Sequence, residues 1–121
     1  MADYAPTMNP AWPGPIKPGA HAVTFDKSTA ADHAIVAAPT DGSRIRLISW
    51  VLYIAAGNTL TFKSGSSTIA GMVFEFGGQA YWQSGVHEGL RVEAAANTAL
   101  NLTLGSAQQV KGSFIYDYVH P

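Results

Sequence analysis

Four histidines have the widest chemical range in this sequence, because imidazole serves as a metal ligand, a general base and a proton shuttle. They are His21, His33, His87 and His120, and two of them adjoin a carboxylate, in Asp32-His33 and His87-Glu88. Neighbouring residues of a strand point to opposite faces, so neither pair forms a natural chelate. The spacing indicates loop or surface histidines, and we expect no metal site.

Carboxylates and serines are the other groups that a hydrolase would need. The eight acidic residues fall mostly at turns and strand edges, where they occur for structural reasons. No serine stands in a G-x-S-x-G elbow, because Ser64-Gly65-Ser66-Ser67 has the composition of a hairpin loop. The sequence contains no cysteine, and no glycine-rich phosphate loop precedes a helix. We therefore expect no enzymatic activity, no catalytic residue and no cofactor.

Three aromatic residues have both a chemical and a structural interpretation. Tyr81 and Trp82 follow Gly77-Gly78, and such a pair, with Trp50, is able to stack against a sugar ring. Aromatic residues near a strand end belong more often to a core or to a subunit interface. The core or interface interpretation is favoured, and carbohydrate binding is kept as an alternative.

Short strands are the elements that would position these groups. Leu100, Leu102 and Leu104 alternate with Asn101 and Thr103, the period-2 pattern of a strand with one buried face. About eight such segments at even spacing, with Gly-rich turns and no amphipathic helix, predict an all-β protein. We expect an antiparallel β-sandwich, jelly-roll-like, although the pattern does not separate a jelly roll from other sandwich topologies. The expected strands are residues 33–38, 43–56, 58–63, 68–76, 79–83, 89–95, 98–104 and 108–119.

The longest expected strand, residues 43–56, is apolar on both faces in its second half. Such a strand is either central in a sandwich whose outer face is covered, or part of a subunit interface. The tentative oligomer interface consists of Ile48, Trp50, Leu52, Ile54, Tyr81 and Trp82.

Residues 1–28 form a proline-rich arm, and residues 29–121 form the sandwich domain. Four prolines lie between Pro10 and Pro18, and Pro6 stands upstream. Proline fixes φ and removes the backbone donor, which excludes a helix or a central strand; residues 21–25 could form a short extended segment. In polyproline II geometry residues 1–20 reach roughly 60 Å. The arm is expected to bind a partner through its apolar side chains, Tyr4, Met8, Trp12, Ile16, Val23 and Phe25.

The composition limits the classes of partner. Charged residues make up 12% of the chain, about half the ~25% usual for soluble domains. This favours a surface covered by other subunits, with a β protein coated by Thr and Ser as the alternative. The net charge is −1 and the basic residues are scattered, so a nucleic-acid interface is not expected. The longest apolar run, residues 47–56, is too short for a bilayer span, and no basic segment opens a signal peptide. We expect a soluble protein made in the cytoplasm, without a membrane partner.

A pattern of expected strands and turns extends through residues 44–119. The pattern begins with RIRLISWVLYIAAGNTLTFKSGSSTIAG and continues later with ALNLTLGSAQQVKGSFIYDYV. The residues that carry it are 45–57, 60–67 and 100–118. This pattern resembles small β-sandwich structural proteins of tailed bacteriophages. The resemblance implies a non-enzymatic virion protein, most like a capsid decoration (cement) protein. Such a protein binds the major capsid protein on the outer face of the head as a homotrimer and stabilises the head. The alternative it implies is a tail or fibre-base component, or a host-adhesion protein that binds carbohydrate.

Overall fold

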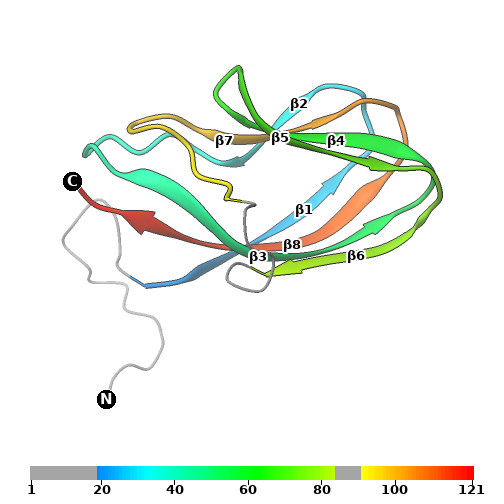
Figure 1. Cartoon of the computed structure of the whole chain (residues 1–121), viewed down its shortest axis with the longest axis horizontal. Coiled ribbons are helices and arrows are strands. Elements are labelled where there is room, and N and C mark those ends of the chain that lie inside the picture. Colours follow the sequence, from blue (N-terminus) through cyan, green and yellow to red (C-terminus); the bar gives the residue numbers. More distant parts are fainter. Residues whose placement is uncertain (1–18, 84–90) are drawn as a thin grey trace, which may run out of the picture.

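The computed structural model describes residues 19–83 and 91–121, which fold into eight strands in two layers (Figure 1). None of these described residues forms a helix long and apolar enough to cross a membrane. The strands are β1 (His21–Lys27), β2 (Asp32–Val36), β3 (Arg44–Ile54), β4 (Asn58–Ser64), β5 (Ser67–Phe74), β6 (Gly78–Gln83), β7 (Leu100–Leu104) and β8 (Val110–Val119).

Two four-stranded antiparallel sheets make up the sandwich, with strand orders β1-β8-β3-β6 and β2-β7-β4-β5. The first strand pairs with the last, the second with the seventh, the third with the sixth and the fourth with the fifth. The chain is thus one long hairpin that turns between β4 and β5 and is wrapped into two layers. This is jelly-roll connectivity, so the predicted fold class is confirmed and its topology is now specified.

The core lies between the sheets and is aliphatic around a small group of aromatic rings. Phe62 of β4 lies at its centre, with ring centroids 5.3 Å from Trp50 and 6.1 Å from Phe114. Phe25 meets Phe114 edge to face at 5.7 Å. The alternation expected from Leu100 onward is present, because the three leucines of β7 are buried.

A β-bulge in β3 changes which positions of this strand face the core. The register with β8 shifts between Leu47 and Ser49. Ile45 and Leu47 face inward before the bulge, and after it the inward positions are Trp50, Leu52 and Ile54. A bulge adds one residue to one strand, which moves the following side chains to the opposite phase. The second half of β3 therefore has a buried face, and its other face is exposed.

Two expected segments differ in the structure. Residues 91–95, within the expected strand 89–95, form only an isolated bridge between Glu93 and Arg46, although Val92 and Ala94 are buried as the alternation predicts. They hydrogen-bond to the part of β3 that precedes its pairing with β6, where that edge is free of β6. β1 lies inside the range assigned to the arm, yet it pairs along its whole length with β8 and belongs to the sandwich.

Candidate interaction surface

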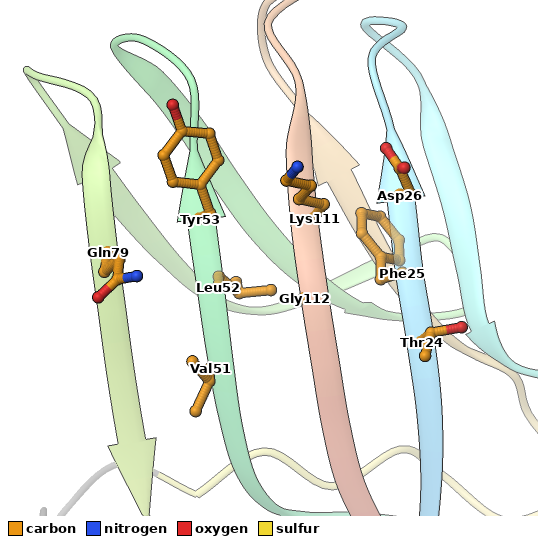
Figure 2. Close-up of a pocket in the computed structure, with 9 residues that line it drawn as sticks. All are labelled: Thr24, Phe25, Asp26, Val51, Leu52, Tyr53, Gln79, Lys111 and Gly112. Atoms are coloured by element: carbon orange, nitrogen blue, oxygen red, sulfur yellow. The ribbon is translucent and has the colours of Figure 1, made fainter.

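The outer face of the β1-β8-β3-β6 sheet carries an open depression of about 490 Å³ (Figure 2). Four side chains from the four strands follow one another in register across this face, namely Asp26, Lys111, Tyr53 and Gln79. Gly112, at the middle of β8, also lines the depression. The depression is lined by residues from all four strands of this sheet.

The walls of this depression combine apolar and polar groups. Val51 is 52% exposed and Tyr53 42% exposed, although both are large apolar residues. The Lys111 ammonium lies 5.6 Å from the centroid of the Tyr53 ring, within cation–π range. Asp26 Oδ1 accepts a hydrogen bond of 2.9 Å from Gln109 Nε2. The depression therefore offers an exposed aromatic face, a cation and a carboxylate within one small area.

The edge strand β5 is the second unusual surface. It ends the β2-β7-β4-β5 sheet, and residues 64–74 contain no charged side chain. Val73 on β5 is 73% exposed, and Phe76 in the following turn is 81% exposed. Natural edge strands are usually blunted by charge, proline or a cover, because their free N–H and C=O groups pair readily with other strands. The β5 edge has neither charge nor proline.

Among the described residues, a group that resembles catalytic machinery consists of Asp41, Ser43 and His120. Ser43 Oγ lies 2.9 Å from His120 Nδ1, and Asp41 Oδ2 lies 3.9 Å from the same nitrogen. A Ser-His-Asp triad needs the serine and the carboxylate on different ring nitrogens, and Ser43 is buried besides. Hydrogen bonds from the hydroxyl and the backbone N–H of Ser43 lower the pKa of Asp41. The geometry is that of a structural clasp at the C-terminus.

Arg46 and Tyr118 are held by contacts within the fold. Arg46 makes a two-pronged ion pair with Asp117, at 2.9 and 2.7 Å, which raises the pKa of the Arg46 guanidinium. Burial, together with the neighbouring Tyr116, raises the pKa of Tyr118 to about 12. No group of three potential metal ligands occurs within residues 19–83 and 91–121.

Comparison with known proteins found no matching family model and no matching curated protein. Among solved structures, the chain is similar to one reported under the description "Bacillus endospore appendages form a novel family of disulfide-linked pili". The identity is 16%, the match covers 93% of this chain and 96% of that one, and the TM-score is 0.48. That description is of pili, and the likeness assigns no function to this chain.

The resemblance to bacteriophage proteins is corrected by this comparison, since the match is to a pilus protein. The predictions of a capsid decoration protein, a tail or adhesion component, a virion location, a major capsid protein as partner and a capsid-bound homotrimer are wrong. The physical reason is that the stretches carrying the resemblance lie mainly on β3, β4, β7 and β8, the central strands of the two sheets. Alternating apolar residues and turns at those positions reflect the packing of a β-sandwich, and unrelated proteins share this architecture.

The predicted arm residues fall into two groups. Tyr4, Met8, Trp12 and Ile16 lie outside the described residues, so their role stays a prediction. Val23 and Phe25 lie on β1, where Phe25 is buried in the core and Val23 packs against it. These two are accounted for by the fold of the chain itself.

The predicted oligomer interface is also divided. Trp50, Leu52 and Ile54 are core residues and offer no surface to a partner in this fold. Ile48 is half-buried at the bulge. Tyr81 and Trp82 lie on β6, whose backbone pairs with β3, and their side chains are outside the described part of the chain. An interface role for Ile48, Tyr81 and Trp82 stays a prediction.

The exposed apolar residues Val51, Tyr53, Val73 and Phe76 did not emerge from the sequence as surface candidates. The signal for the first two was present in the alternation of β3, since Ile45 and Leu47 are out of phase with Trp50 and Leu52. The signal for Val73 was the charge-free run that ends at Phe74, whereas Phe76 lies beyond Glu75 and had no such signal.

Proposed function

We propose that this chain is a non-catalytic structural subunit that associates with copies of itself by pairing the edge strand β5. The observation that carries the proposal is the edge of β5 itself, which is uncharged and bears the 73% exposed Val73. Antiparallel pairing of β5 with β5 of a second copy would satisfy the free backbone groups of both and cover both valines.

The opposite edge of the same sheet supports the choice of β5. β2 contains Asp32, which pairs with Lys63 and accepts a hydrogen bond from Thr103, and its register is interrupted by a bulge at Ile35. Charges and bulges are the devices by which natural edges avoid pairing. β5 also has a register shift, because Phe62 pairs with Ala70 and Lys63 with Thr68. The two edges therefore differ in charge, and the uncharged β5 is the better suited to addition of a strand.

Pairing of β5 with β5 of a second copy produces a closed dimer, so a polymer would need a second contact between copies. The 121 residues contain no cysteine, so disulfide linkage of the kind named for the endospore appendages is not available to this sequence. Any larger assembly of these residues would be held by non-covalent contacts.

Replacement of Val73 by Lys is expected to weaken self-association. Two lysines brought together across the paired edge would repel, and the dissociation constant should rise at least about tenfold, equivalent to 1.4 kcal/mol. Light scattering after size-exclusion chromatography, over a range of concentrations, measures the change.

The matched control is Ala34→Lys, which places the same charge on the exposed β2 edge of the same sheet. It should associate like the unmodified chain. The proposal fails if the unmodified chain is monomeric at every concentration, or if both lysine variants behave alike.

A further inference from the structure

We infer that the depression on the outer face of the β1-β8-β3-β6 sheet receives the proline-rich segment, residues 10–18, of a second copy of this chain. The inference rests on the self-association proposed above and supplies its second contact. It pairs an exposed, partly apolar depression with a mostly apolar segment that would be stabilised by being covered.

Residues 10–18 read PAWPGPIKP, and their proline content favours polyproline II geometry. With three residues per turn, one column of side chains is Pro10, Pro13 and Ile16, and a second is Trp12, Pro15 and Pro18. The third column holds Ala11, Gly14 and Lys17. Two of the three faces are therefore apolar, and the remaining face carries the only charge.

The depression matches such a segment in chemistry. Proline-rich ligands dock against exposed aromatic rings, and Tyr53 presents one that is 42% exposed beside Val51. A polyproline II backbone has no internal hydrogen bonds, so its carbonyl groups need donors. Thr24 and Gln79 line the depression and supply a hydroxyl and an amide. Asp26, on the same face, is a partner of opposite charge for Lys17.

The attachment of the segment favours a second copy over its own domain. It joins the sandwich through Gly19, an exposed residue with nothing within 4 Å of the position that a Cβ would take. The 18 residues before Gly19 reach about 56 Å in polyproline II geometry, whereas β1, with 7 residues, is about 23 Å long. The arm is long enough to cross to a neighbour and longer than its own domain requires.

The absence of cysteine allows a direct test with single introduced thiols in the full-length chain. Trp12→Cys in one preparation is mixed with Val51→Cys in another that carries a size tag, under mild oxidation. We expect a disulfide-linked heterodimer on a non-reducing gel, formed at least about ten times faster than by random collision, because docking raises the local thiol concentration. Thr24→Cys, on β1, serves as a second receiving position should Val51→Cys fail to fold.

The matched control is Val73→Cys, which places the same thiol on another exposed valine. Equal cross-linking of Trp12→Cys to both valine positions, or to neither, would overturn the inference. So would a chain carrying both Trp12→Cys and Val51→Cys that closes only within itself, because the occupant would then be its own arm. Light scattering of the unmodified chain separates the two proposals. If the chain forms oligomers but the Val51 cross-link does not appear, this inference alone is rejected. If the chain is monomeric, the proposed function is rejected as well.

Discussion

Gly112→Ala is expected to lose at least about 3 kcal/mol of unfolding free energy, beyond the usual range for an added methyl group. A Cβ at this position would overlap the carbonyl oxygen of Val51 and lie 3.0 Å from the Cα of Leu52. Both atoms belong to the backbone of β3, so no side-chain rotation relieves the contact. β8 pairs with β1 and β3 at once, and a displacement at Gly112 would disturb both ladders.

Gly71→Ala is the control for this substitution. The nearest atom to its added Cβ is the hydroxyl of Thr61 at 3.8 Å, an ordinary contact. Its effect should stay within about 1 kcal/mol, with reduced freedom of the unfolded chain acting in favour of the folded state. Urea unfolding at one low protein concentration compares the two variants. Equal losses, or a small loss at Gly112, would show that β3 and β8 yield more easily than their spacing implies.

The sandwich was predictable because its information is local. Alternating residues such as Leu100, Leu102 and Leu104 specify which face of a strand is buried, and glycine-rich turns mark where strands end. The pairing of strands was not predictable in this way, because it depends on contacts between distant segments. β1 and β8 lie at opposite ends of the described chain, and nothing in the sequence of either strand indicates its partner. Jelly-roll connectivity therefore could not be separated from other sandwich topologies.

The assignment of Trp50, Leu52 and Ile54 to an interface has a specific physical cause in β3. Read as one uninterrupted strand, Ile48, Trp50, Leu52 and Ile54 share a face, and the remaining apolar residues require a partner. The bulge between Leu47 and Ser49 places the last three inside the sandwich and leaves Tyr53 outside. A change of phase in the alternation is a local signal, but it is ambiguous until the partner strand is known.

The low charge content was a more reliable signal than the resemblance. Charged residues make up 12% of the chain, and residues 64–74, which include β5, contain none. The β5 edge and the depression are the places where the described surface shows apolar groups to solvent. The sequence indicated a surface suited to contacts between subunits, and the fold was needed to locate it.

A second strong effect is expected at Asn58, which is 5% exposed and joins the β3–β4 turn to the β7–β8 loop. Its Oδ1 accepts hydrogen bonds from the N–H groups of Thr59 and Ser106, at 2.9 and 3.0 Å. Its Nδ2 donates to the carbonyl oxygens of Ser106 and Gln108, both at 3.3 Å. The amide thus faces two donors on one side and two acceptors on the other.

Asn58→Asp keeps the size of the side chain and replaces the donating nitrogen by an oxygen that faces two carbonyl groups. At neutral pH the buried charge should lower the unfolding free energy by about 3–5 kcal/mol. The introduced carboxyl is disfavoured in its charged form by the fold, so its folded pKa lies above the unfolded value near 3.9. The lost stability should therefore return as the pH falls through the folded pKa, and disappear again as it rises.

Asn97→Asp is the matched control, because the Asn97 Oδ1 only accepts a hydrogen bond, from the Gly42 N–H at 2.7 Å, and an aspartate retains that acceptor. Urea unfolding of both variants between neutral and mildly acidic pH measures the effect. The difference between them should narrow toward low pH, because protonation restores a donor at residue 58 and changes little at residue 97. A difference that does not depend on pH would assign the loss at Asn58 to packing, and the four hydrogen bonds would then not be what joins the turn to the loop.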